Sequence, residues 1–264
     1  MGHALSLEKN GVDLEMANNK QFRTRRNIIV AVIALLLLLV GVNPDFLSEQ
    51  QPFDTATQQQ QSDVLAESTN TGDIALDVLD DLAVRGRASK TGYSRDQFSS
   101  GWATIGSCDT RNIILQRSMS DIELSEDACV VLSGTLLDPY TGKSIDFMRG
   151  SSTSADVQID HVVALSDAWQ KGAQQLDETQ RLLFANDPLN LLAVDGPANQ
   201  QKGDSDAASW LPPYKNYRCR YVARQISVKR EYSLWVSAAE KASMKRVLNG
   251  CGEQRLPVEE FITD

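Results

Sequence analysis

The sequence predicts an α+β fold with additional helices and two disulfides. The pattern from Val157 to about Ala208 runs strand, excursion, strand, turn and helix, and helical patterns precede and follow it. Four cysteines follow a long apolar run near the N-terminus. The chain has 264 residues, of which 42% are hydrophobic. That is enough for one domain with a real core, and two domains of ordinary size would be a tight fit.

The N-terminal region predicts export and attachment to a membrane. Residues 28–42 carry no charge, and four basic side chains precede them within residues 20–26. Basic residues before an apolar run keep the N-terminus in the cytoplasm. No small-x-small cleavage site follows the run, so we expect a cytoplasmic segment at 1–27 and a signal anchor at 28–43. Secretion after signal cleavage is the alternative, and a twin-arginine signal at "TRRNII" ranks third.

Residues 44–72 predict a disordered linker, because they are rich in Gln, Ser, Thr, Asp and Asn and poor in residues that build a core. The folded domain is then residues 73–264. The chain has a formal net charge of −9, much of it from the first half of the exported region. This acidity argues against tight, non-specific coating of DNA, but it does not exclude a nucleic-acid substrate.

The first helix of the folded domain is predicted by apolar spacing. Ile74, Val78, Leu79 and Leu82 recur at helical intervals, and Gly86 supplies a stop. Two further helices are predicted near the C-terminus, at 216–232 and 237–248, and the second begins with a capping box.

The central elements follow in order from residue 157. Residues 157–165 have the character of a buried strand, and 166–176 have that of a helix. A second short helix at 176–188 must end at its Asp-Pro pair. Residues 189–194 return to strand character, and a turn then leads to a helix that starts near 197–199.

The cysteines predict two disulfides, because exported thiols tend to be oxidised in pairs. No Cys-x-x-Cys spacing is present, which argues against a four-cysteine zinc site. Short β-type runs at 112–115 and 130–132 each follow a cysteine, so an antiparallel pairing would join Cys108 to Cys129. The two C-terminal helices should be antiparallel, which would join Cys219 to Cys251.

The stretch "VQIDHVVAL" carries the candidate chemistry. His161 is the only histidine of the exported domain, so a multi-histidine zinc site cannot form. Asp160 and Asn199 could supply oxygen ligands for Mg²⁺ if the strand end and the later helix meet. Side chains alternate along a strand, so His161 should point away from Asp160 and be free to act as a base.

Several segments in one order resemble the HNH endonucleases, in particular the exported branch related to the C-terminal domain of GmrSD-type restriction enzymes. These segments are "CDTRN", "DPYTG", "IDHVVALSDAWQKGA", "FANDPLNLLAV", "NQQKGD" and "WLPP". The resemblance extends from about Arg85 to Cys251. It implies a ββα-metal (HNH) core, so that residues 73–264 would be an HNH nuclease domain.

The resemblance also implies a role for each matching residue. His161 matches the general base that deprotonates the attacking water, and Asp160 matches a metal ligand. Asn190 matches the asparagine that braces the loop carrying the base. Asn199 stands where many HNH enzymes have a histidine ligand, which favours Mg²⁺ or Mn²⁺ over zinc; a helix cap is the alternative for this side chain. Lys202 could neutralise phosphate charge.

Other residues leave two interpretations open. Asp109 and Arg111 could form a structural ion pair beside the disulfide, or Arg111 could bind a phosphate. The basic side chains within 215–230 could form a solvated helix face or contact nucleic-acid backbone. The four tryptophans are interpreted as packing residues rather than base-stacking platforms: Trp102, Trp169, Trp210 and Trp235.

The implied function is hydrolysis of phosphodiester bonds with one metal ion, leaving a 5′ phosphate and a 3′ hydroxyl. No added DNA-reading module is evident, so little sequence specificity is expected. DNA is favoured over RNA as the substrate, the membrane is contacted through the anchor, and no protein partner is predicted. The alternative is a cell-surface module that binds nucleic acid on the same fold without turnover.

Overall fold

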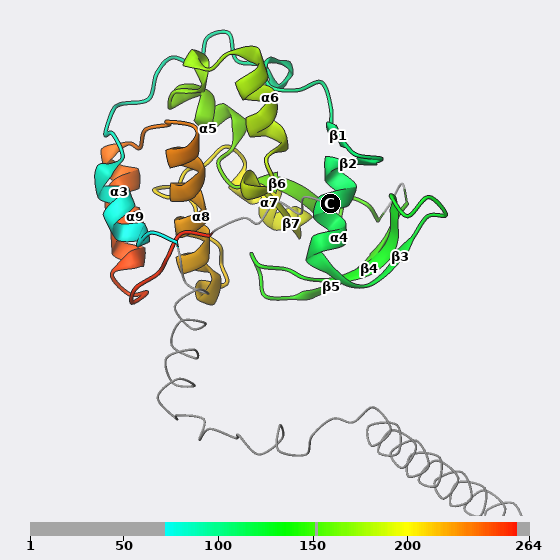
Figure 1. Ribbon diagram of the computed structural model, residues 1–264. Coiled ribbons are helices and arrows are strands. Elements are labelled where there is room, and N and C mark those ends of the chain that lie inside the picture. Colours follow the sequence, from blue (N-terminus) through cyan, green and yellow to red (C-terminus); the bar gives the residue numbers. More distant parts are fainter. Residues whose placement is uncertain (1–71, 151–152, 258–264) are drawn as a thin grey trace, which may run out of the picture. The chain divides into compact units, whose positions relative to one another are not determined.

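The computed structural model describes residues 72–150 and 153–257 (Figure 1). The expected cytoplasmic segment at 1–27 and the signal anchor at 28–43 lie outside the described residues, as does the expected linker apart from its last residue. Within the described part of the chain, no helix is long and apolar enough to cross a membrane.

The described residues form a mixed α+β fold, as predicted. The helices and strands follow in this order: α3 (Ala75–Asp81), η2 (Arg95–Gln97), β1 (Thr104–Ile105), β2 (Cys108–Asp109), α4 (Thr110–Ser118), β3 (Met119–Leu124), β4 (Val131–Leu137), β5 (Ser144–Met148), β6 (Val157–His161), α5 (Leu165–Gln170), η3 (Ala173–Gln175), α6 (Glu178–Asn186), η4 (Pro188–Asn190), β7 (Leu191–Asp195), α7 (Gly196–Lys202), η5 (Lys215–Tyr217), α8 (Arg218–Glu231) and α9 (Ala238–Leu248).

A strand–strand–helix unit lies at the centre of the domain. β6 and β7 pair antiparallel, with Val157 opposite Asp195 and His161 opposite Leu191. Asp195 then caps α7, because its carboxylate accepts a hydrogen bond from the backbone N–H of Ala198. Gly196 is required at this turn, since a Cβ there would lie 2.1 Å from the carbonyl oxygen of Ala155. The predicted order of strand, strand and helix is therefore correct, although β6 ends at His161 and not at residue 165.

The β6–β7 hairpin is covered on both faces. On one face, Val157 and Ile159 pack in a core cluster with α4 and with the three-stranded antiparallel sheet β3–β4–β5. On the other face, Val194 packs with α7 and α8 around Tyr221. A strand pair enclosed in this way places the side chains of β6 in two separate environments.

The predicted strand at 112–115 is wrong, because these residues lie in helix α4. Asp109 starts the helix by accepting a hydrogen bond from the backbone N–H of Asn112 at 2.7 Å. Helical geometry also buries Ile114 and Leu115 against β4. The cap and the burial together outweigh the β-propensity of the two consecutive isoleucines, Ile113 and Ile114. The second predicted strand, at 130–132, is present as the start of β4.

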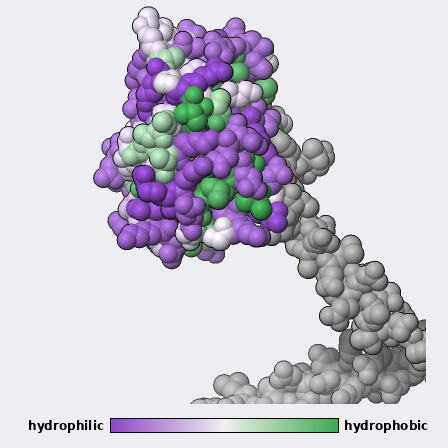
Figure 2. Space-filling view, turned by 90° about the vertical axis from the view of Figure 1, so that its left-hand side faces the viewer, coloured by the Kyte–Doolittle hydropathy of each residue, from purple (hydrophilic) through white to green (hydrophobic). Residues whose placement is uncertain are grey.

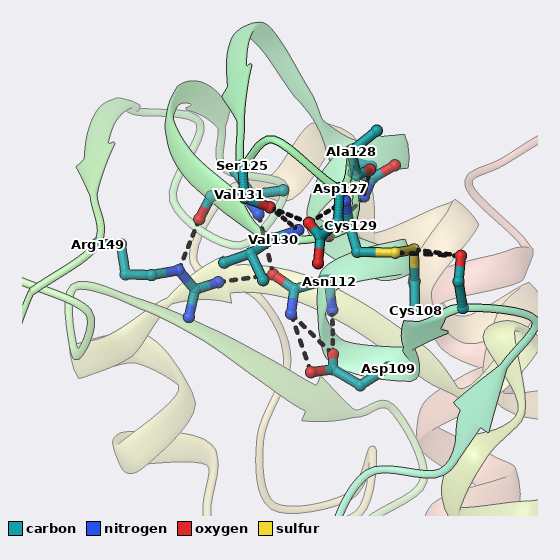
Figure 3. Close-up of a disulfide and its surroundings, with 12 residues drawn as sticks. Cys108, Asp109, Asn112, Ser125, Asp127, Ala128, Cys129, Val130, Val131 and Arg149 are labelled. Carbon is teal, nitrogen blue, oxygen red and sulfur yellow. Dashed lines mark hydrogen bonds between the residues drawn. A yellow bond between two sulfur atoms is a disulfide. The ribbon is translucent and has the colours of Figure 1, made fainter.

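Both predicted disulfides are present, Cys108–Cys129 and Cys219–Cys251. The reason given for Cys108–Cys129 needs correction: Cys129 precedes β4, but Cys108 lies in β2, directly before α4. Asn112 of α4 accepts a hydrogen bond from the N–H of Val131, which joins the helix to β4 beside the bridge (Figure 3).

The C-terminal helices agree with the prediction. Ser237 and Glu240 form the capping box of α9, and the Cys219–Cys251 bridge joins the start of α8 to the residues after α9. Helices α3 and α9 lie on one side of the domain, which is mostly hydrophilic with small, separate hydrophobic patches (Figure 2).

The basic run of α8 is not a uniformly solvated face. Lys229 is fully buried and contacts the carboxylate of Glu240 at 3.1 Å. Arg230 pairs with Asp73, whereas Lys215 and Arg220 are exposed. The buried lysine therefore belongs to an internal ion-pair network and not to a nucleic-acid surface.

A long connection, residues 82–103, is named the strap here. It runs from α3 across α5 and α6 to β1 (Figure 1). Backbone hydrogen bonds fix it to the domain, including Ala88 N–H to the carbonyl of Gln170. Phe98 is 2% exposed and packs edge-on against Trp169 and beside Phe184. The strap is therefore anchored through its own aromatic side chain.

Candidate active site

Asp160 and His161 point to opposite faces of β6, as strand geometry predicts. Asp160 faces α7, where its Oδ1 accepts a hydrogen bond from Lys202 Nζ at 2.9 Å. His161 faces the strap, and its ring lies parallel to that of Trp102, with centroids 5.9 Å apart and an angle of 11° between the planes. The two adjacent side chains therefore lie in different sites.

His161 is held in one tautomer while it is neutral. Its Nε2 lies 2.9 Å from the carbonyl oxygen of Ala185. A carbonyl can only accept, so Nε2 carries the hydrogen and Nδ1 carries the lone pair. The side chain is 6% exposed, and burial lowers its pKa to about 3. His161 is consequently neutral near pH 7, with an unprotonated Nδ1.

A pocket of about 180 Å³ lies beside His161. Its walls come from strap residues between Arg95 and Trp102, and from Leu165 and Ala185. His161 thus lines a small pocket together with Arg95 and Trp102. Asp109, Arg111 and Asp160 are not part of its lining.

Both carboxylate oxygens of Asp160 accept a hydrogen bond. Lys202 Nζ contacts Oδ1, and the hydroxyl of Tyr140 donates to Oδ2. Burial raises the pKa of Asp160, which the Lys202 charge and the Tyr140 bond oppose. Asp160 is 5% exposed and Lys202 is fully buried.

These contacts do not fit the expected metal site. Both carboxylate oxygens of Asp160 already accept a hydrogen bond, and a metal ion there would be repelled by the ammonium of Lys202. In the described part of the chain, no group of three or more His, Cys, Asp or Glu side chains could hold a metal ion. The burial of Lys202 also does not fit the expected neutralisation of phosphate charge. Instead its Nζ donates to the carbonyl oxygen of His161 at 2.9 Å.

Asn199 lies on the same side of β6 as Asp160. Its amide nitrogen donates to Oε1 of Gln158 at 2.9 Å, and Gln158 is two residues before Asp160 on the strand. The alternative that Asn199 caps α7 is wrong, because Asp195 is the cap and Asn199 lies inside the helix.

Asn190 is fully buried and joins the segment after His161 to the rest of the domain. Its Oδ1 accepts from Val163 N–H at 2.9 Å, and its Nδ2 lies 3.4 Å from the carbonyl oxygens of Val163 and Phe184. The backbone carbonyl of Asn190 accepts from Val162. These contacts connect the segment after His161 to the end of α6.

Asp109 and Arg111 lie near the Cys108–Cys129 bridge. Both carboxylate oxygens of Asp109 accept hydrogen bonds from Asn112 Nδ2, at 3.0 and 2.9 Å (Figure 3). Arg111 donates to the carbonyl oxygen of Val157 at 3.3 Å, and burial lowers its pKa. Asp109 therefore has a structural role in the α4 turn, and Arg111 contacts the start of β6.

Sequence reasoning missed three residues around the site. Tyr140 lies in "DPYTG", which entered the sequence analysis only as a segment of the family resemblance, with no role for the tyrosine. Trp102 was interpreted as a packing residue; it packs beside the core cluster of α4 and β4, but it also stacks on His161. Arg95 was not singled out, because no local signal indicates that the strap returns to His161.

The fold and the site define a disulfide-containing α+β domain with one buried, neutral histidine at a pocket. The chain matches the family described as "GmrSD restriction endonucleases, C-terminal domain" over residues 109–247, and it belongs to this family. It is also 41% identical over 180 residues to a protein from Arthroderma benhamiae named "Uncharacterized secreted protein". That match covers 67% of this chain and 84% of the relative. The resemblance noted from the motifs is thereby confirmed.

Proposed function

We propose that this protein is an exported endonuclease that hydrolyses phosphodiester bonds of nucleic acid, with DNA favoured over RNA and little sequence specificity. Membership of a restriction endonuclease domain family supports the reaction class. The observation that carries the proposal is the His161 ring, which lines a pocket with its Nε2 hydrogen bonded to a carbonyl and its Nδ1 lone pair available.

In the proposed reaction, Nδ1 of His161 takes a proton from water. The water oxygen bonds to phosphorus, and the bond from phosphorus to the 3′ oxygen breaks. The products are a 5′ phosphate and, after protonation, a 3′ hydroxyl. The Nε2–H bond to Ala185 and the Trp102 ring hold the imidazole in one orientation, which lowers the cost of aligning it. We propose that Asn190 positions the segment that follows His161.

The proposed cofactor, Mg²⁺ or Mn²⁺, rests on the HNH resemblance. The expected ligands are Asp160 and Asn199, but both carboxylate oxygens of Asp160 already accept a hydrogen bond, one of them from an ammonium. No step above therefore depends on the metal. We propose that Lys202 acts as a positioning residue, since its ammonium joins α7 to both Asp160 and the His161 carbonyl.

The proposed location is outside the cell. Two disulfides and a relative named as secreted support export. Attachment through an anchor at 28–43 remains a prediction, and secretion after cleavage remains its alternative. Fractionation of the native host tests it: the anchor predicts protein in the membrane fraction, and recovery in the medium with a new N-terminus near residue 43 contradicts it.

One observation favours the alternative function of a nucleic-acid-binding module without turnover. An ammonium lies against the Asp160 carboxylate, where the family resemblance implies a metal ion. If the metal is essential and the ion pair never opens, the domain could bind nucleic acid without cutting it.

Incubation of the purified full chain with plasmid DNA and with RNA, in Mg²⁺, Mn²⁺ or EDTA, separates the two functions. The proposal predicts nicking in a divalent metal and much slower nicking by His161→Ala, which also controls for contaminating nucleases. Binding of labelled nucleic acid without cleavage under every condition would instead support the binding module.

A further inference from the structure

Arg95 lines the same pocket as His161. We propose that Arg95 is the phosphate-binding residue of this site and contacts the phosphodiester that His161 attacks through water. This inference rests on the proposed function and extends it to a substrate contact. Arginine suits such a role, because its planar fork donates two hydrogen bonds to two phosphate oxygens.

Arg95 is available to bind an anion. Its side chain is exposed and makes no hydrogen bond or ion pair with the described residues. Other arginines of the domain are occupied: Arg87 pairs with two carboxylates, and Arg149 donates to the Val131 carbonyl and to Asn112. An unpaired guanidinium at a pocket is therefore free to form charge-assisted hydrogen bonds with a ligand.

Arg95 and His161 are fixed relative to each other by one aromatic cluster. Arg95 opens the short helix η2, which Phe98 follows, and Phe98 packs with Phe184 at a ring-centroid distance of 5.7 Å. The next residue, Ala185, accepts the hydrogen bond from His161. The backbone of Arg95 is thus preorganised, while its side chain can reach a ligand.

Asp96 is the feature that opposes phosphate binding. Asp96 is exposed and lines the pocket next to Arg95, so its negative charge would repel an approaching phosphate. Exposed charge interactions typically contribute no more than about 1 kcal/mol, which corresponds to about fivefold in affinity. Asp96→Asn should therefore raise kcat/KM by up to about fivefold. A decrease on this substitution would contradict phosphate binding at this position.

Arg95 and Trp102 precede the residues that match the family, 109–247. The strap therefore contributes a part of the pocket that lies outside the matched family region. Its residues complete the wall around His161.

The test compares Arg95→Ala and Arg95→Lys with the parent, using the full chain and labelled DNA and RNA oligonucleotides. Arg246→Ala is the matched control, because Arg246 is also an exposed arginine, lies on α9 and does not line this pocket. Arg95→Ala should lower kcat/KM by about 10²-fold. Arg95→Lys should recover part of the loss, since lysine keeps the charge but not the fork. Arg246→Ala should match the parent.

Equilibrium binding supplies a readout that does not need turnover. In the His161→Ala background, Arg95→Ala should weaken oligonucleotide binding and lower the slope of log Kd against log salt by about one. Circular dichroism and thermal unfolding establish that each variant is folded.

The outcomes separate the inference from the proposed function. If the parent cuts and His161→Ala does not, a parental rate for folded Arg95→Ala overturns the inference alone. If the parent does not cut, the proposed function fails, and the binding experiment alone tests the phosphate contact. An unchanged affinity and salt slope for Arg95→Ala overturn the contact. Weaker binding together with a smaller salt slope supports it.

Discussion

Lys202 Nζ lies 2.9 Å from Oδ1 of Asp160, and both side chains are buried. The ammonium lies beside a carboxylate that the family resemblance identifies as a metal ligand. Together with its bond to the His161 carbonyl, this contact joins α7 to the strand that carries the candidate base. The relationship predicts how stability and metal binding depend on Lys202.

Lys202→Met should destabilise the protein by about 3–5 kcal/mol, because it leaves the buried carboxylate of Asp160 without its cation. Urea unfolding measures the loss. Lys245→Met is the control, since Lys245 pairs with Asp80 at the exposed surface and should change stability little.

Removal of the Lys202 ammonium should also change metal binding. Without nucleic acid, Mg²⁺ or Mn²⁺ should leave the melting temperature of the parent unchanged, because Lys202 occupies the approach to Asp160. In Lys202→Met the metal can take that position and should raise the melting temperature. Equal stabilisation of parent and variant by the metal would contradict the closed state of Asp160.

The lowered pKa of His161 predicts that the protein loses stability in acid. Its pKa is about 3 in the folded protein and about 6.5 in the unfolded chain, so the unfolded state binds more protons between these values. Stability should therefore fall as pH decreases from about 6.5 to about 3, with His161 contributing at most about 1.4 kcal/mol per pH unit.

Urea unfolding between these pH values, with His161→Phe as the comparison, isolates this contribution. Other titrating groups are common to both proteins, so the variant should show the shallower pH dependence. Parallel curves would mean that His161 is not buried in its neutral form.

Replacement of the buried Lys171 should also cause a large loss of stability. Its Nζ contacts carboxylates of Asp167 at 2.8 Å, Asp206 at 2.7 Å and Glu240 at 2.6 Å. Lys171→Met should cost about 3–5 kcal/mol, because three carboxylates lose a shared cation. Denaturant titration of Lys171→Met against the parent measures this, and a loss below that of the exposed Lys245→Met would show that the network is dispensable.

The disulfides should each stabilise the fold by about 2–4 kcal/mol. They close stretches of similar length, with sequence separations of 21 and 32, so the loop-entropy contributions should be similar. Paired Cys→Ser substitutions, one bridge at a time, measure each contribution. Peptide mapping without reduction should yield the two linked pairs and no crossed linkage.

Local patterns were sufficient to predict the elements that hold the site. The Asp-Pro pair that ends α6 and the capping box of α9 depend on neighbouring residues, and both are present. The strand predicted at 112–115 failed because a cap at Asp109 and burial against β4 decide for a helix.

The surroundings of the site depend on contacts between distant residues, which local patterns do not contain. Trp102 stacks on His161 from the strap, and Tyr140 reaches Asp160 from a turn. Lys202 was expected to neutralise phosphate charge, and neither its ion pair with Asp160 nor its burial could be predicted from spacing.

The central claim is that Nδ1 of His161 is the general base, and the cleavage rate of His161→Ala with and without added imidazole tests it most directly. Loss of the base should lower the single-turnover rate by about 10² to 10⁴. Imidazole that enters the vacated space should restore part of that rate, and it should not change the cleavage rate of the parent. A folded His161→Ala protein that cleaves at the parental rate would contradict the claim.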